Sequence, residues 1–245
     1  MFRTATIRTI GLVAAMALGA TGAPAGETKE RPRVVLELFT SQGCSSCPPA
    51  DALLEELGGR DEVVALGYHV DYWDYIGWAD TFGSPAYSDL QRDYARSFGE
   101  RRIYTPQLVV NGEMHVVGSR RDEVMAALDT YRLVLPIKLS QDGEFLSIEI
   151  GGDVTCPEAV VWLISFRQQA EVMVERGENG GKALAYSNIV TGRQALGMFE
   201  PEAGARMRLP LADVLAGGAD AIAVLVQVES GGLPGKILGA ASLAL

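Results

Sequence analysis

Two cysteines separated by two residues, Cys44 and Cys47, are the residues of this chain best placed to do chemistry. They follow an apolar run and precede Pro48, and proline is favoured in the first turn of a helix because its missing N–H costs nothing there. A helix N-terminus carries about half a positive charge, and a cysteine there can have its pKa lowered from about 8.5 to between roughly 3.5 and 7.5. The spacing therefore predicts thiol–disulfide exchange.

A structural disulfide and a metal site are the two alternatives for this pair. Closing a loop of about four residues stabilises a protein by only roughly 2 kcal/mol, and a disulfide that serves stability is expected to span more chain. Thiolates also bind soft metals such as copper(I) or zinc. We favour redox chemistry, with Cys44 as the more exposed, attacking thiol and Cys47 as the thiol that resolves the mixed disulfide.

Two titratable residues are candidates for tuning these thiols. Glu37 lies in an apolar strand, where a carboxylate is costly unless it is paired or protonated. It is either a proton shuttle for Cys47 or an acid that reaches out between domains. His69 ends the second predicted strand, at the edge where open α/β sheets bind ligands. Three roles are open for His69: a protonated ring would lower the thiol pKa, a neutral ring would bind a metal beside the two sulfurs, or the side chain would only hold the loop at Asp71.

Strands and helices alternate around the cysteines. Apolar runs at 34–39 and 63–70 flank a helical pattern that begins at Pro48, and this β-α-β unit should be parallel and right-handed. Residues 71–100 form an insertion with its own helix after Ser84. A strand from Thr105, a hairpin at Asn111-Gly112 and a last helix follow. The predicted order over about residues 31–133 is therefore β-α-β, insertion, β-β-α.

The pattern changes after Pro136 to short alternating strands separated by glycine-rich turns. We predict a β-rich, sandwich-like second domain over residues 134–245. Its predicted strands are 137–140, 145–150, 160–166, 221–228 and 236–245.

This order of elements, with Thr105-Pro106 opening the third strand, resembles the thioredoxin fold. The resemblance implies an α/β fold with a thioredoxin-like domain at 31–133 followed by the β-rich domain. It also implies that Pro106 is cis and faces the cysteine pair, although only about 5–6% of X–Pro bonds are cis in general. Thioredoxins carry a buried acid six residues before the first cysteine, whereas Glu37 lies seven residues before Cys44.

Longer motifs resemble an exported bacterial family known as domain of unknown function twelve twenty-three. The matching segments are Glu37–Asp51, His69–Asp74 with Gly77-Trp78, Tyr104–Gln107 with Val110–Gly112, Glu175–Asn179 and Gly235–Ala240. They cover both halves of the chain, and the cysteine motif is the most specific. The family commonly has a histidine just before Asn188, where this chain has Ser187, so no role of that histidine carries over. The resemblance implies a fold but no established substrate.

Aromatic residues follow the second predicted strand. Trp73, Tyr75 and Trp78 either only cover the sheet or form a docking surface for an extended polypeptide. His115 lies on the predicted hairpin, where we expect it on the surface. Cys156 has no partner among the three cysteines, and we expect a buried thiol.

The N-terminus has the features of a secretory signal peptide. Arg3 and Arg8 supply positive charge, residues 10–22 are apolar and small, and Ala23-Pro24-Ala25 offers a cleavage site. A membrane anchor is the alternative, but the apolar stretch is short for one. We expect residues 1–25 to be removed and the protein to be periplasmic or secreted, in an oxidising compartment and free of the membrane.

The formal net charge is −10, and it becomes −12 without the two arginines of the signal peptide (−10 − 2). Such an acidic protein is a poor partner for nucleic acid or anionic lipid.

The sequence as a whole favours an exported thiol–disulfide oxidoreductase that acts on protein or small-molecule thiols and disulfides and needs no organic cofactor. Thr105, Pro106, Trp73 and Trp78 are the expected substrate contacts. The alternatives are a soft-metal carrier that uses Cys44, Cys47 and His69, and a non-catalytic binding protein on the same scaffold. The sequence gives neither the substrate, nor the direction of electron flow, nor the oligomeric state.

Overall fold

The computed structural model describes residues 1–2, 28–29 and 32–245. All but the first two residues of the predicted signal peptide lie outside these ranges. Within them, no helix combines the length and the apolar character that crossing a membrane requires.

The first half of the chain has the predicted order of elements. In chain order they are β2 (Val34–Thr40), α1 (Pro48–Gly58), β3 (Val63–His69), the 3-10 helix η1 (Asp74–Ile76), α2 (Pro85–Ser97), β4 (Gln107–Val110), β5 (Met114–Val117) and α3 (Arg121–Thr130). Strand β3 pairs with β2 in parallel, and β4 pairs with the other side of β2 in the antiparallel sense. The hairpin between β4 and β5 turns at Asn111 and Gly112, which both have positive φ (48° and 65°), as a two-residue primed turn requires.

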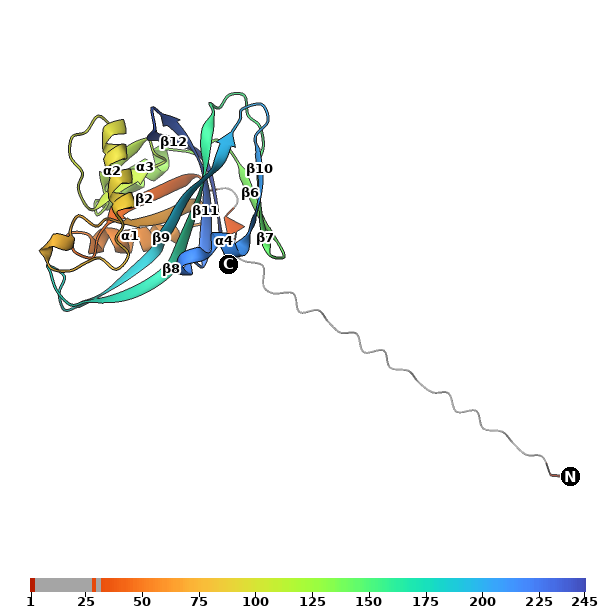
Figure 1. The fold of residues 1–245 in the computed structure, drawn as a ribbon, viewed down its shortest axis with the longest axis horizontal. Coiled ribbons are helices and arrows are strands. Elements are labelled where there is room, and N and C mark those ends of the chain that lie inside the picture. Colours follow the sequence, from red (N-terminus) through yellow and green to blue (C-terminus); the bar gives the residue numbers. More distant parts are fainter. Residues whose placement is uncertain (3–27, 30–31) are drawn as a thin grey trace.

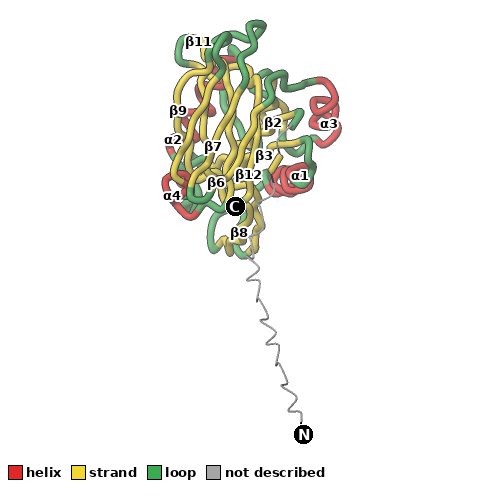
Figure 2. The backbone as a smooth tube through the Cα atoms, turned by 90° about the vertical axis from the view of Figure 1, so that its right-hand side faces the viewer, coloured by secondary structure: helices red, strands yellow, loops and turns green. Residues whose placement is uncertain are grey.

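The helices of this half lie on opposite faces of the sheet. Figure 2 shows α1 and α3 on one side of the strands and α2 on the other. Side chains alternate along β2 accordingly. Leu36 and Leu38 pack in the core under α1 and α3, whereas Val35 and Phe39 pack in the core under α2. A residue on β2 therefore faces either α1 or α2 according to whether its number is even or odd.

The second half is almost entirely strand. Its elements are β6 (Ile137–Asp142), β7 (Phe145–Ile150), β8 (Ala159–Val174), β9 (Lys182–Phe199), β10 (Ala205–Pro210), α4 (Leu211–Val214), the 3-10 helix η2 (Ala216–Gly218), β11 (Ala221–Ser230) and β12 (Leu233–Ala244). The five predicted strands are present, but β8 is much longer than expected, with 16 residues. The 18-residue β9 and the short β10 were not predicted. The predicted α/β class with a β-rich second half is confirmed.

Two sheets organise the molecule. The larger has the order β1-β12-β11-β8-β9-β3-β2-β4-β5, where β1 is Thr28–Lys29, and the smaller has the order β10-β7-β6. The smaller sheet packs against the larger one through a core that contains Ile148, Val161 and Val224 (Figure 1). The larger sheet runs across the expected domain boundary at residue 133, because Gly67 of β3 pairs in parallel with Ile189 of β9.

The two halves also share a hydrophobic core. Phe39 and Tyr94 of the first half pack in one cluster with Ile164, Leu225 and Ile237 of the second half. The long β8–β9 hairpin reaches from the β-rich half to the first half (Figure 1). This shared packing fixes the hairpin relative to the strands that lead into the C-x-x-C segment.

Candidate functional site: a covered disulfide at a helix N-terminus

The predicted cysteine pair lies at the start of a helix. The Sγ atoms of Cys44 and Cys47 are 2.12 Å apart, which is disulfide distance. Cys47 is the N-cap residue of α1 and already has helical dihedral angles (φ −79°, ψ −35°), and Pro48 follows as the first helical residue. The Cys47 N–H donates to the carbonyl oxygen of Cys44 over 3.3 Å, which closes the turn between the two cysteines.

Both sulfurs are shielded from solvent. Cys44 is 1% exposed and Cys47 is fully buried, so the expected difference in exposure between the two cysteines is only marginal in this closed form. The exposed part of the turn is Ser45 and Ser46, and the Ser46 hydroxyl lies 3.4 Å from the Cys44 sulfur. The pair is buried because two distant segments pack on its loop.

The first covering segment is the tip of the β8–β9 hairpin. Asn179 is fully buried, and its Nδ2 donates to the carbonyl oxygens of Gln42 (3.0 Å) and Cys44 (2.9 Å). Lys182 Nζ donates to Asn179 Oδ1 over 2.9 Å and fixes the orientation of the amide. Asn179 therefore ties the β-rich half to the cysteine loop, a role that the sequence analysis missed.

The second covering segment is the aromatic insertion. A Cβ built on Gly43 would lie 2.9 Å from Cβ of Trp73, so only glycine allows this close approach. The indole Nε1 of Trp73 donates to Thr105 Oγ1 over 2.8 Å. The Thr105–Pro106 bond is cis, as predicted. Trp73 therefore connects the cysteine loop with the Thr105–Pro106 turn.

Trp78 and Tyr75, the other two aromatic residues predicted for the docking surface, differ in their surroundings. Trp78 Nε1 donates to Gln42 Oε1 over 2.8 Å, which adds a further tie to the cysteine loop. Tyr75 is 81% exposed and its ring stacks on Trp73, with centroids 6.4 Å apart. An exposed aromatic ring therefore lies beside the covered disulfide.

His69 is paired with a buried acid. Its Nδ1 lies 2.9 Å from Oδ2 and 3.1 Å from Oδ1 of Asp80, and both residues are buried. Asp80 Oδ2 also accepts from the Gln42 N–H over 2.7 Å. Burial alone would raise the pKa of Asp80, but the neighbouring His69 and these hydrogen bonds hold it below its usual value. His69 thus anchors a loop, as one interpretation expected, but the loop is that of Asp80 rather than Asp71.

The three residues of the metal alternative, Cys44, Cys47 and His69, have other partners in this structure. Over residues 1–2, 28–29 and 32–245, no group of three or more His, Cys, Asp or Glu side chains is arranged to hold a metal ion. Cys44 and Cys47 are joined to each other, and Nδ1 of His69 is engaged by Asp80.

A second buried acid lies close to the disulfide and was not among the predicted site residues. Asp51, in the first turn of α1, is 6% exposed, and its Oδ2 has no hydrogen-bond partner within the described part of the chain. Burial raises the pKa of Asp51 to about 7, and the opposing influence of His69 is too small to cancel this effect. The available signal was its position four residues after Cys47, on the same helical face.

Glu37 is buried but on the wrong face of the sheet for the predicted proton shuttle. It occupies an odd-numbered position of β2, and its Oε2 accepts from the Tyr94 hydroxyl of α2 over 2.5 Å. Helix α1, with Cys47, packs on the opposite face. The prediction that Glu37 is a proton shuttle for Cys47 is therefore wrong. Glu37 lies seven rather than six residues before Cys44, and a shift of one residue along a strand turns the side chain to the other face of the sheet.

Glu37 belongs instead to a buried polar network between the two halves. Gln227 of β11 donates through Nε2 to the Tyr94 hydroxyl (2.7 Å), and Arg193 of β9 donates to Gln227 Oε1 (2.9 Å). Burial raises the pKa of Glu37, although the Tyr94 hydrogen bond and Arg193 act in the opposite direction. This network links α2 to the β-rich half.

Comparison with known proteins identifies the family of the chain. Residues 35–227 match the model of the family described as protein of unknown function (DUF1223). The chain belongs to this family. A crystal structure of a protein from Agrobacterium tumefaciens, solved by a structural genomics consortium, is 34% identical, with a TM-score of 0.79. The similarity covers 88% of this chain and 95% of that one. No curated protein matches the chain.

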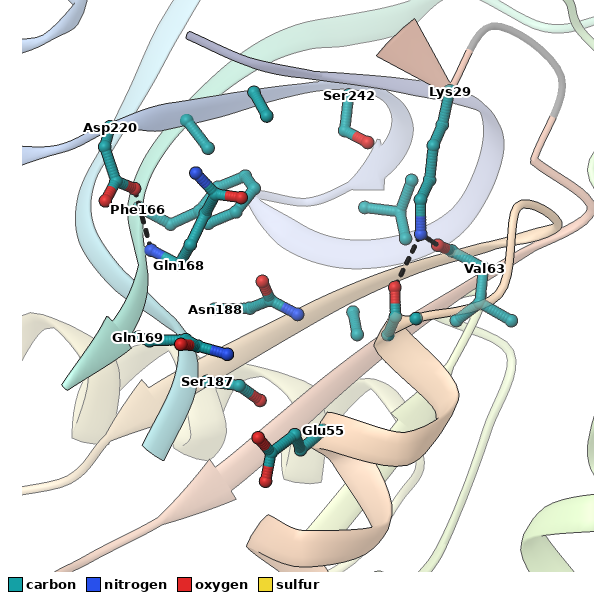
Figure 3. Close-up of a pocket in the computed structure, with 16 residues that line it drawn as sticks. Lys29, Glu55, Val63, Phe166, Gln168, Gln169, Ser187, Asn188, Asp220 and Ser242 are labelled. Atoms are coloured by element: carbon teal, nitrogen blue, oxygen red, sulfur yellow. Dashed lines mark hydrogen bonds between the residues drawn. The ribbon is translucent and has the colours of Figure 1, made fainter. Parts of the chain in front are cut away.

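The protein also has a cavity of about 570 Å³ that neither cysteine lines. It lies between the end of α1, the start of β3 and the strands of the β-rich half, and Figure 3 shows Glu55, Ser187 and Asn188 around it. Lys29 Nζ, at its rim, donates to three backbone carbonyl oxygens. Ser187 is 9% exposed and lines this cavity. Among the described residues its hydroxyl has no hydrogen-bond partner, so it makes no hydrogen bond to the cysteine loop.

Two remaining predictions concern single residues. Cys156 is 7% exposed and not disulfide-bonded, so the expected buried thiol is confirmed, and burial raises its pKa. His115 is half-buried rather than on the surface, because its Nδ1 lies 2.9 Å from the Tyr104 hydroxyl and its ring packs against Phe98.

Proposed function

We propose that the protein is an exported thiol–disulfide oxidoreductase whose first half is thioredoxin-like. Cys44 is the nucleophile and Cys47 the resolving thiol. The observation that carries the proposal is the disulfide-bonded C-x-x-C at the N-terminus of α1, joined through Trp73 to the cis Thr105–Pro106 turn. The unpaired N–H groups and positive end of a helix stabilise a thiolate at this position.

The chemistry is two successive exchanges. The Cys44 thiolate attacks a disulfide R–S–S–R′, forms a mixed disulfide with R–S and releases R′–S⁻. The Cys47 thiolate then attacks the Cys44 sulfur, closes the disulfide seen here and releases R–S⁻. The reverse sequence oxidises a dithiol substrate. A periplasmic or secreted location, which the N-terminal segment favours, suits either direction.

Substrate access requires the covering segments to move. Both sulfurs are buried, while Ser45, Ser46 and Tyr75 are exposed around them. We assign Trp73, Trp78, Thr105 and Pro106 to the surface that an extended polypeptide or a small disulfide meets once the loop opens. His69 acts here as a positioning residue, because its partner Asp80 holds the Gln42 N–H.

The burial of the sulfurs favours a second candidate, a non-catalytic binding protein with an inert disulfide. One experiment separates the two functions. The chain from Gly26 onward is equilibrated with reduced and oxidised glutathione, and the thiol state of Cys44 and Cys47 is quantified by mass spectrometry after acid quenching. Cys156→Ser serves as the background, and Cys47→Ser is mixed with a disulfide-bonded peptide to trap Cys44.

A pair that equilibrates with glutathione and a trapped peptide on Cys44 support the oxidoreductase. A disulfide that stays closed at every glutathione ratio, with no trapped peptide, refutes it and favours the binding protein. A reduced chain that retains copper(I) through dialysis, without exchange activity, favours the soft-metal carrier.

A further inference from the structure

The resolving step poses a problem of proton transfer. Cys47 is fully buried while the covering segments are closed, so solvent does not reach its thiol in that state. The thiol nevertheless has to ionise before it attacks the Cys44 sulfur, because the thiolate is the nucleophile. A buried carboxylate on the α1 side of the sheet can take this proton without help from solvent.

Asp51 is a buried acid that lies one helical turn after Cys47. Cys47 has helical dihedral angles, and the Asp51 N–H donates to its carbonyl oxygen over 3.1 Å, so the two residues are related as i and i+4 within α1. Residues with this spacing lie one above the other on the same helical face. Both side chains are buried, and Oδ2 of Asp51 has no hydrogen-bond partner among the described residues.

The groups around Asp51 come from every element packed against it. Thr40 of β2 presents a hydroxyl to the Asp51 carboxyl. His69 of β3 lowers the pKa of Asp51 and Asp80 of the following loop raises it. Tyr186 of β9 is also close, and the charge of Asp51 raises the pKa of its hydroxyl. The rings of His69 and Tyr186 pack together with centroids 4.8 Å apart. The raised pKa of Asp51, about 7, suits a group that takes up and returns a proton near neutral pH.

We propose that Asp51 is the internal proton acceptor for Cys47 when the mixed disulfide on Cys44 is resolved, an inference that rests on the proposed oxidoreductase function. The Cys47 S–H proton passes to the Asp51 carboxylate, and the resulting thiolate forms a bond to the Cys44 sulfur. The bond between Cys44 and the substrate sulfur breaks, and the substrate leaves as R–S⁻. In the opposite direction the protonated Asp51 returns the proton as Cys47 is released.

The test follows the resolution of a preformed mixed disulfide across pH 5 to 9. Wild type, Asp51→Asn and Glu37→Gln are each reduced and mixed with a disulfide of a chromophoric thiol, and release of the second thiol is timed by stopped flow. Asp51→Asn is expected to resolve at least tenfold more slowly at pH 7, since general base catalysis is worth about 10²- to 10⁴-fold, and to lose the inflection near pH 7. Glu37→Gln is the matched control, because it removes a buried acid on the opposite face of the sheet. This variant should keep both the wild-type resolution rate and the inflection near pH 7.

The outcomes distinguish the two proposals. A wild-type protein that forms no mixed disulfide overturns the function and this role together. A wild type that exchanges, with an Asp51→Asn variant of unchanged rate and pH profile, overturns only the role of Asp51. If Asp51→Asn does not fold, ¹³C-carboxyl NMR of aspartate-labelled wild type replaces it. A carboxyl that titrates near 7 and shifts on reduction supports the role, and one that titrates near 4 in both redox states overturns it.

Discussion

Removing the Asn179 side chain should make the disulfide much easier to reduce. Its amide makes two hydrogen bonds to carbonyl oxygens of the cysteine loop, at 3.0 Å and 2.9 Å. Each is worth about 0.5–1.5 kcal/mol net, so Asn179→Ala weakens the closed state of the loop by about 1–3 kcal/mol. That corresponds to a population of the open loop that is about 5- to 150-fold larger.

The assay measures reduction through the open state. Because Cys44 is 1% exposed and Cys47 is fully buried, a bulky reductant such as a trialkylphosphine reaches the disulfide only when the loop opens. The rate of reduction at low reductant concentration should therefore rise by the same factor. It is followed by timed alkylation and mass spectrometry.

Glu178→Ala is the matched control, because Glu178 is the exposed neighbour of Asn179 in the same loop. Its reduction rate should match that of wild type. Asn179→Asp replaces the donating amide with an acceptor that faces two carbonyl oxygens, and it should open the loop at least as much as alanine. Equal reduction rates in wild type and Asn179→Ala would refute the argument that the hairpin tip controls access.

Three further predictions concern single side chains. After reduction, Cys44 should be alkylated faster than Cys156 and with a midpoint below 8.5, which rate measurements against pH test; a midpoint near 8.5 contradicts the helix-terminus argument. Tyr94→Phe should lower the free energy of unfolding by about 1–3 kcal/mol, measured in urea, since it leaves the buried Glu37 carboxyl without its hydroxyl donor; an unchanged midpoint contradicts this. Because the pKa of Asp51 rises from 3.8 to about 7 on folding, its contribution to stability is present below pH 3.8 and lost as the pH rises to 7. Between pH 3.8 and 7 the free energy of unfolding of Asp51→Asn should therefore fall by up to about 4 kcal/mol less than that of the wild type. Identical pH profiles of unfolding in the variant and the wild type would contradict this.

Much of the first half could be predicted from local patterns. Pro48 marks the start of α1, and Asn111-Gly112 marks a hairpin, because both signals depend on backbone preferences of the residues themselves. The long strand β9 could not be predicted in this way. Strand β9 contacts β8, β3 and α1 over different parts of its length, so the burial of its side chains changes along the strand. Its sequence therefore lacks the regular alternation of apolar and polar residues by which a strand is recognised.

The roles of the two acids show the same division. The sequence indicates that Glu37 lies in a strand, but its face depends on the register of β2 between α1 and α2, and a change of one residue reverses it. Asp51 looks like an ordinary acid in the first turn of a helix, where exposed carboxylates are common. Its significance comes from burial against neighbouring strands, which no local signal contains.

The sequence by itself determines that two cysteines stand at the start of a helix, within an α/β first half followed by a β-rich second half. These features follow from the chemistry and periodicity of neighbouring residues. Only the tertiary structure decides that the cysteines are covered. Asn179 lies 135 residues beyond Cys44 in the chain, and the polar bonds between them form only because the two halves share one sheet and one core. Contacts over such separations depend on the packing of the whole chain, which a local pattern does not record.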